Sequence, residues 1–170
     1  MKENEILIDE YRGEKEELLS LIKRFWLVHN DYVEPDEEAM EDLSSWTDEG
    51  HKVYIISKED SAIGFIHIGS RGVEMDWIED LFIIPEESGK GYGSIALEMI
   101  EQKIREYSTS AYIEVAARNT RALKLYYKHG YDCLNTITIR KDFKPDEYKI
   151  MQKENLFGYE FEVKEYNEPD

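Results

Sequence analysis

A glycine-rich turn between an apolar segment and an amphipathic helix constrains the fold of this chain most. The turn reads Ser-Gly-Lys-Gly-Tyr-Gly over residues 88–93 and follows the apolar segment 75–84. Glycines let backbone N–H groups approach a ligand with no Cβ between them, and a helix N-terminus adds about half a positive charge. The segment therefore predicts an anion site at a strand-to-helix turn. The alternative is an ordinary tight turn.

The loop departs from two familiar phosphate-binding patterns. It lacks the Gly-x4-Gly-Lys-[Ser/Thr] spacing of a Walker-type loop. It also lacks the third glycine of Gly-x-Gly-x-x-Gly, because Ala96 takes that position after Gly91 and Gly93. The segments before it read as an antiparallel meander instead of a βαβ unit. Neither a nucleoside-triphosphate loop nor a dinucleotide fold is expected.

Apolar periodicity predicts a mixed α/β chain. The expected helices span residues 14–29, 35–46, 93–107 and 120–129. The expected strands span residues 6–9, 52–57, 62–69, 75–84, 111–115 and 131–139. The tail from Asp142 is expected to hold a helical segment near 146–154 and a last strand near 159–164.

Charge and composition exclude several classes of function. The chain carries 38 acidic against 21 basic residues, a net charge of −17, which repels nucleic acids and acidic lipid surfaces. Cys133 is the only cysteine and the four histidines form no His-x3-His pair, so we expect neither a disulfide nor a metal site. No apolar run approaches the roughly 18 residues of a membrane span. A cytoplasmic protein is the default expectation.

A second motif follows the glycine loop. It reads Asn119-x-x-Ala122-x-x-Leu125-Tyr126-x-x-x-Gly130-Tyr131. The two motifs in this order resemble the acetyl-CoA-dependent N-acetyltransferases of the GNAT superfamily, over about residues 54–131. The resemblance implies an α/β fold with a mostly antiparallel central sheet of about seven strands, splayed between strands 4 and 5 and flanked by about four helices. It also implies a single acetyltransferase domain over residues 1–170, with 142–170 as a C-terminal extension that adds a strand.

The resemblance implies acetyl-CoA as co-substrate. The glycine loop would meet its pyrophosphate, and the splayed backbone after the fourth strand would pair with its pantetheine arm. Asn119 would hydrogen-bond the same arm, act as a helix N-cap, or do both. Ser88 stands where the family usually has Arg or Gln, and Lys90 supplies a positive charge two residues on. The expected cofactor-binding residues are Phe82, Ile83, Ile84, Ser88, Gly89, Lys90, Gly91, Tyr92, Gly93, Ser94, Asn119 and Tyr126.

Direct acetyl transfer to an amine needs a general base and a general acid. By resemblance, Tyr126 protonates the departing thiolate, or else it only packs. Glu79 is the expected base, because several family members place a carboxylate there. Strand alternation would put Glu79 and Asp80 on opposite faces, so at most one of them serves. His67 is an alternative base, although a histidine in an apolar strand is more often simply packed.

The charge distribution bears on the ligands. No acidic residue lies between Glu114 and Asp132, a window holding four basic residues, which suits polyanionic coenzyme A or is an ordinary helix face. Six of the nine residues 34–42 are acidic, and the family places this region beside the acceptor pocket. This acidic segment favours a polyamine, an aminoglycoside or a basic peptide as the acceptor. The alternative is that it is simply a solvated surface.

The expected function is therefore transfer of acetyl to a primary amine, with a small polycation as the candidate acceptor and a homodimer left open. The alternatives are a protein N-terminal or lysine acetyltransferase and a non-catalytic acyl-CoA-binding regulatory domain. No nucleic-acid or membrane partner is expected.

Overall fold

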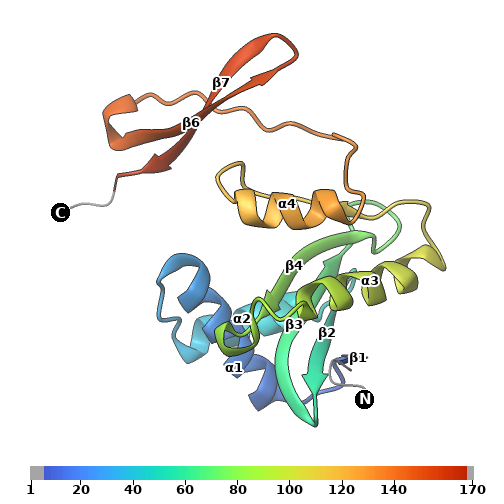
Figure 1. The fold of residues 1–170 in the computed structure, drawn as a ribbon. Coiled ribbons are helices and arrows are strands. Elements are labelled where there is room, and N and C mark those ends of the chain that lie inside the picture. Colours follow the sequence, from blue (N-terminus) through green and yellow to red (C-terminus); the bar gives the residue numbers. More distant parts are fainter. Residues whose placement is uncertain (1–5, 168–170) are drawn as a thin grey trace. The chain divides into compact units, whose positions relative to one another are not determined.

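The computed structural model describes residues 6–167 (Figure 1). The chain divides into two compact units, Met1–Glu114 and Val115–Asp170. The first holds the sheet and three helices, and the second holds one helix and a hairpin. That residues 1–170 work as one domain stays a prediction.

The first unit is built on a five-stranded sheet in sequence order. Its strands are β1 (Leu7–Glu10), β2 (His51–Lys58), β3 (Ser61–Gly69), β4 (Trp77–Ile83) and β5 (Tyr112–Ile113). The pairings from β1 to β4 are antiparallel, and β4 pairs with β5 in parallel. Glu59 and Asp60 join β2 to β3 with φ of 49° and 63°, the left-handed conformations of a two-residue hairpin turn. This turn and the mostly antiparallel order confirm the sequence-based expectation.

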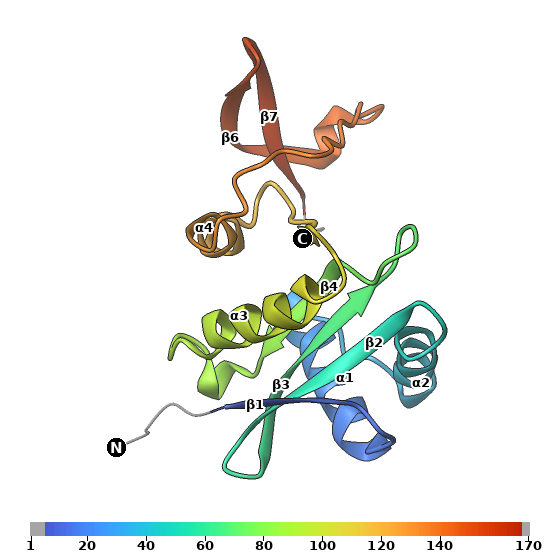
Figure 2. The same ribbon diagram turned by 90° about the vertical axis from the view of Figure 1, so that its right-hand side faces the viewer.

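Helices cover both faces of this sheet (Figure 2). Helices α1 (Lys15–Asn30) and α2 (Asp36–Trp46) lie on one face, and α3 (Tyr92–Arg105) lies on the other. The core on the α1/α2 face consists of Leu18, Leu21, Ile22, Phe25, Ala39, Trp46, Val53, Ile55, Phe65 and Phe82. Successive strand residues alternate between the faces. The buried Ile56, Ile66 and Ile68 therefore turn toward α3. The same alternation determines on which face of the sheet each polar side chain lies.

The sheet opens between its last two strands, as the family resemblance implies. Strand β5 pairs with β4 only at Trp77↔Tyr112 and Ile78↔Ile113. The following part of β4, up to Ile83, pairs only with β3 within the described chain. A Cβ on Gly64 of β3 would lie 2.0 Å from the carbonyl oxygen of Phe82, so glycine is needed where these two backbones approach.

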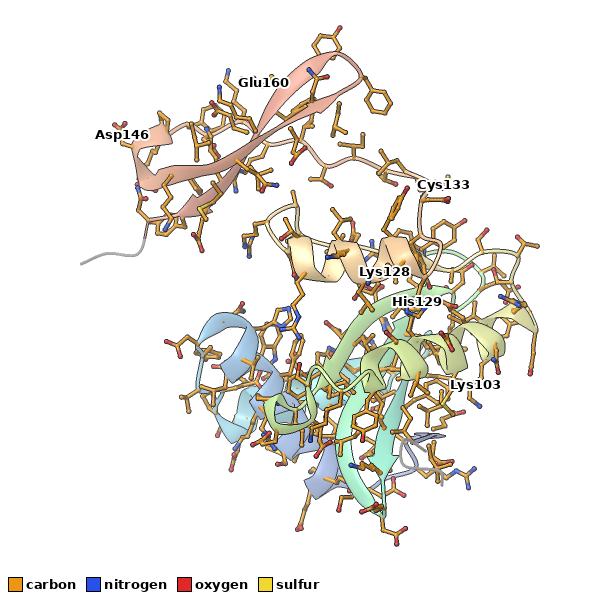
Figure 3. The ribbon with its side chains drawn as sticks, in the orientation of Figure 1. Lys103, Lys128, His129, Cys133, Asp146 and Glu160 are labelled. Atoms are coloured by element: carbon orange, nitrogen blue, oxygen red, sulfur yellow. The ribbon has the colours of Figure 1, made fainter. Side chains whose placement is uncertain are left out.

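The second unit differs from expectation in two segments. Helix α4 (Thr120–Lys128) is confirmed, and Cys133 lies exposed on the segment beyond it (Figure 3). Residues 131–139 are not a strand. Their backbone pairs with no strand of the described chain, and Leu134 and Ile139 are exposed. An alternating pattern forms a strand only when a partner completes its hydrogen bonds.

The tail forms a hairpin of β6 (Tyr148–Leu156) and β7 (Tyr159–Tyr166). The expected strand near 159–164 is confirmed, but the helix near 146–154 is wrong. Cross-strand ion pairs such as Lys153 with Glu160 at 2.7 Å, and the left-handed turn at Phe157-Gly158, hold this polar segment extended. No helix in the described part of the chain is long and apolar enough to cross a membrane.

Candidate functional site

The glycine loop lies between β4 and α3. A short 3-10 turn, η1 (Pro85–Glu87), leaves β4, and the chain then turns through Gly89 and Gly91 with φ of 79° and 91°. The backbone N–H groups of residues 89–93 donate to no group of the described chain. The first N–H groups of a helix lack intrahelical partners and attract anions. The loop therefore has the geometry of an anion site.

Side-chain charge contributes less to this loop than the sequence indicates. The ammonium of Lys90 lies 3.0 Å from a carboxylate oxygen of Glu87. This hydrogen bond holds the pKa of Glu87 below its usual range. Since Lys90 is already paired with a carboxylate, the main-chain N–H groups of residues 89–93 are the donors that this loop offers without a partner in the described chain.

The end of β4 presents a free backbone edge beside the loop. The N–H of Ile84 donates to the carbonyl of Ile63 on β3 at 2.8 Å. Bonded and non-bonded residues alternate along an antiparallel pair, so the N–H and C=O of Ile83 point away from β3. An extended chain could pair with this edge through Ile83, whereas the N–H of Ile84 is already bonded to β3. Cofactor binding by Phe82, Ile83 and Ile84 stays a prediction.

A chain of polar side chains crosses three strands on the α1/α2 face. His67 Nδ1 lies 2.9 Å from a carboxylate oxygen of Asp80, and His67 Nε2 lies 2.9 Å from His51 Nδ1. His67 is 4% exposed and its ring stacks on Trp46, with centroids 4.9 Å apart. His51 is partly exposed. The row of side chains thus runs from the half-buried Asp80 through the buried His67 to the partly exposed His51.

A β-bulge changes the faces expected for Glu79 and Asp80. The β3–β4 register passes from His67↔Asp80 to Ile68↔Ile78, which leaves Glu79 as an extra residue. A Cβ on Gly69 would lie 3.1 Å from Glu79 Oε1 and 3.0 Å from the His51 ring. Both acids therefore turn to the α1/α2 face. The expectation of opposite faces is wrong, because alternation fails at a bulge.

Both carboxylate oxygens of Glu79 are bound by Arg71, from the β3–β4 loop, at 3.1 and 2.7 Å. Arg71 also pairs with Glu114 at 2.7 Å and lies 3.9 Å from the centre of the Trp77 ring. The pKa of Arg71 is raised by its hydrogen bonds to Glu79 and Glu114, and that of Glu114 is lowered by Arg71. Arg71 therefore occupies one acceptor site on each carboxylate oxygen of Glu79 and pairs with its negative charge.

Two predicted residues lie in the second unit. Asn119 caps α4, with its side-chain oxygen accepting from the Ala122 N–H at 3.1 Å, so the N-cap reading is confirmed. Tyr126 is half-buried, and its ring packs edge-on against Tyr131 with centroids 6.0 Å apart. Their roles toward acetyl-CoA stay predictions.

The acidic segment 34–42 contains one buried carboxyl. Glu34 is 6% exposed, and one of its oxygens has no hydrogen-bond partner within the described chain. Burial, followed by the charge of Asp42, raises its pKa to about 7. Asp42 in turn accepts from the Trp26 indole N–H at 2.6 Å. Glu37 and Glu41 are exposed, as a solvated surface requires.

Glu34 makes stability pH-dependent. A folded-state pKa of about 7 against the ordinary value of 4.5 means that the folded protein binds the extra proton between these pH values, so stability falls as pH rises through them. Glu34→Gln, which is always neutral, should raise the free energy of unfolding at pH 8 by about 1–3 kcal/mol and leave it nearly unchanged at pH 4. Urea unfolding at both pH values measures this, with exposed Glu37→Gln as control. An equal effect of Glu34→Gln at both pH values would contradict it.

Sequence reasoning missed His51, Arg71 and Glu114. His51 and His67 lie on paired strands, and the β2–β3 hairpin register is the signal that could have joined them. Within residues 6–167, no group of three or more His, Cys, Asp or Glu side chains is arranged to hold a metal ion.

The sequence model of the Acetyltransferase (GNAT) family matches residues 15–131. No curated protein matches the sequence. Solved structures share the fold. A GNAT family acetyltransferase from Elizabethkingia anophelis with acetyl-CoA bound is 19% identical with a TM-score of 0.63, covering 96% of this chain and 95% of that one.

Two further similar structures are aminoglycoside enzymes. An aminoglycoside acetyltransferase from an uncultured soil metagenomic sample, in complex with trehalose, is 15% identical with a TM-score of 0.64, over 84% of this chain and 98% of that one. AAC(6′)-Iy, in complex with the bisubstrate analogue CoA-S-monomethyl-acetylneamine, is 17% identical with a TM-score of 0.62, over 81% and 99%.

Proposed function

The chain belongs to the GNAT family of acetyltransferases, and from this premise we propose that it transfers acetyl from acetyl-CoA directly to a primary amine within a ternary complex. The observation that carries the proposal is the glycine loop, whose free N–H groups open α3 next to the unpaired edge of β4. The loop N–H groups suit a polyanion, and the unpaired edge of β4 suits an extended arm joined to that polyanion.

The residues present fit acetyl-CoA. The N–H groups of residues 89–93 would receive its pyrophosphate, and the outward N–H and C=O of Ile83 would pair with its pantetheine arm. Ser88, Ser94 and Asn119 add polar groups on the same two motifs. When bound, acetyl-CoA supplies the activated acetyl group, and a backbone N–H of β4 is the natural donor to the thioester oxygen.

Tyr126 is the proposed general acid for the thiolate, because it occupies the tyrosine position of the second motif. The acceptor arrives as an ammonium and must lose a proton before it attacks. Glu79 is engaged by Arg71 through both of its oxygens, so a proton placed on it would weaken this ion pair. A nearby base that is not already in an ion pair is better suited to this step.

We propose a small polycation as the acceptor. Exposed acids of the segment 34–42 raise the local concentration of cations. Two similar structures are named as aminoglycoside acetyltransferases, which supports this class of amine. One ammonium would lose its proton and react, and the others would remain charged against the carboxylates. A protein lysine or N-terminal amine is the second candidate, because an acidic surface also attracts basic peptides.

The test is thiol release from acetyl-CoA over a panel of polyamines, aminoglycosides, basic peptides and neutral-chain monoamines. Turnover of polycations is expected, with an apparent KM that rises with salt, since exposed charges are screened beyond about 8–10 Å at physiological salt. Replacing Glu37, Glu38 and Glu41 by Gln should raise that KM and leave the KM for acetyl-CoA unchanged. Equal rates on monoamines and polycations with no salt effect would contradict the polycation. Acetyl-CoA binding without turnover on any amine would support a regulatory domain instead.

A further inference from the structure

We propose that Asp80, His67 and His51 form a proton relay in which His51 is the general base toward the acceptor ammonium, an inference that rests on the proposed amine acetylation. The three side chains belong to β4, β3 and β2 and lie on one face of the sheet. Two contacts of 2.9 Å join them.

The hydrogen bonds fix which nitrogens carry protons. An ionised carboxylate only accepts, so the Nδ1 of His67 must carry the proton that it donates to Asp80. Neutral His67 then has a lone pair on Nε2, and the contact to His51 requires that the Nδ1 of His51 carry a proton. The lone pair of His51 therefore lies on Nε2. Within the described residues nothing is bonded to this nitrogen, so it is available to accept a proton.

The proton balance of the step follows from these tautomers. The ammonium gives its proton to His51 Nε2 and becomes a neutral amine. His51 can pass its Nδ1 proton to His67 Nε2, which moves the positive charge onto His67 beside Asp80. The carboxylate stabilises this imidazolium and stays unprotonated, as in other carboxylate–imidazole catalytic pairs. His51 thus ends neutral with its proton on Nε2, and His67 ends as an imidazolium with a proton on each nitrogen.

The surroundings of His67 distinguish this row of three side chains from a single histidine packed in the core. Trp46 stacks on His67 at 16° between the ring planes, which together with two hydrogen bonds fixes the ring. A core histidine with an acidic partner would need no second histidine. Here His51 continues the chain from the 4% exposed His67 to a partly exposed position.

His51 also lies beside Glu79, the base that the resemblance implies. Its ring and Glu79 Oε1 both lie within 3.1 Å of the Cβ position of Gly69. Among the described residues, the charged groups around it are Asp80 and Glu79 from β4, Arg71, which binds Glu79, and Glu114, which follows β5. Asp48 and Glu49 precede it in the α2–β2 turn. Asp80, Glu79 and Glu114 outnumber the one cation among them, Arg71, and the resulting net negative charge favours an approaching ammonium.

The kinetic test compares His51→Gln with Glu79→Gln in the full chain, using the best amine of the panel. His51→Gln should lower kcat by about 10²–10³-fold, as expected for loss of a general base, with an unchanged Kd for acetyl-CoA. The difference in kcat between His51→Gln and wild type should shrink as the pH approaches the acceptor's own pKa, near 10 for a lysine-like amine. At that pH solvent removes the proton. Glu79→Gln, which removes the competing candidate base, should lower kcat less than His51→Gln does. A large loss for Glu79→Gln with His51→Gln within threefold of wild type would overturn the relay.

Asp80 is a positioning residue in this scheme. Asp80→Asn removes the charge that stabilises the imidazolium, so the acidic limb of kcat/KM should move to lower pH and kcat should fall. A purely structural role would lower activity equally at all pH values. In ¹⁵N NMR of histidine-labelled wild type, both His51 and His67 should show protonated Nδ1 and unprotonated Nε2. A protonated Nε2 on neutral His51 would refute the relay.

These outcomes separate the relay from the proposed function. Wild type that turns over no amine would refute the proposed function, and the base role of His51 with it, whatever tautomers NMR shows. Turnover by wild type with no effect of His51→Gln would refute the relay alone. Turnover with the predicted pH-dependent deficit supports both.

Discussion

Gly91→Val is expected to abolish acetyl-CoA binding, with at least about a 100-fold loss of affinity, equivalent to about 2.7 kcal/mol. Gly91 precedes α3 with φ of 91°, and a Cβ there would meet no atom of the described chain within 4 Å. The side chain would instead stand in front of the N–H groups that open the helix, where an anion must approach. Titration calorimetry with acetyl-CoA measures the loss.

The same substitution also strains the backbone. A β-branched residue at this φ costs about 1–3 kcal/mol of stability. We therefore expect the Gly91→Val protein to be folded but less stable than wild type. Circular dichroism and urea unfolding define a temperature at which the variant is folded for calorimetry.

Gly158→Val is the matched control for Gly91→Val. Gly158 has φ of 84°, a Cβ there also meets no atom of the described chain within 4 Å, and it lies in the β6–β7 turn. It should lose a similar amount of stability and keep acetyl-CoA affinity. Equal affinity of the two folded variants would show that Gly91 is only a turn glycine.

The fold of the first unit could be predicted from sequence because its signals are local. The β2–β3 turn at Glu59-Asp60 and the apolar alternation of both strands lie within a few residues of each other, and the hairpin forms as expected. The opening beside β4 came instead from the resemblance carried by the two motifs. Nothing local in residues 77–83 indicates where pairing with β5 stops.

The tail was harder to predict because its structure depends on partners distant in the sequence. Residues 146–154 are rich in Lys, Glu, Gln and Met, which are good helix formers. Pairing with β7 outweighs this preference, since strand formation depends on cross-strand neighbours. The alternating segment 131–139 shows the converse, because its pattern suits a strand but no described strand pairs with it.

The candidate site also has one part that local sequence predicts and one part that depends on residues distant in the sequence. The glycine loop is local, and its left-handed glycines and free N–H groups lie where the sequence placed them. The grouping of His51, His67 and Asp80 depends on the register of three strands and on one bulge. Alternation read from the sequence alone gives Glu79 and Asp80 opposite faces, whereas the extra residue in β4 brings both to one face. A single inserted residue thus decides which side chains can share a proton.

Tyr126→Phe should lower kcat by about 10²–10⁴-fold, the usual cost of losing a positioned general acid. The ring of Tyr126 packs edge-on against Tyr131. Phenylalanine keeps that ring contact and removes only the hydroxyl, so stability and the Kd for acetyl-CoA should change little. Pre-steady-state thiol release, in which chemistry is observed directly, is the measurement. The loss should be greatest with acetyl-CoA and smaller with a thioester whose thiol is more acidic, because a better leaving group needs less protonation.

Tyr127→Phe supplies the matched control for this prediction. Tyr127 is the next residue on α4, is 68% exposed, and points about 100° away around the helix. The same atom is removed from the same helix, so any general effect of losing a hydroxyl would appear in both variants. If Tyr126→Phe loses less than about threefold, or no more than Tyr127→Phe, its hydroxyl gives no proton to the thiolate. The protonation would then fall to solvent or to the ammonium proton itself. Leaving-group dependence that is equal in wild type and variant would establish that alternative, because an acid that acts only in wild type must reduce the sensitivity of the rate to thiol acidity.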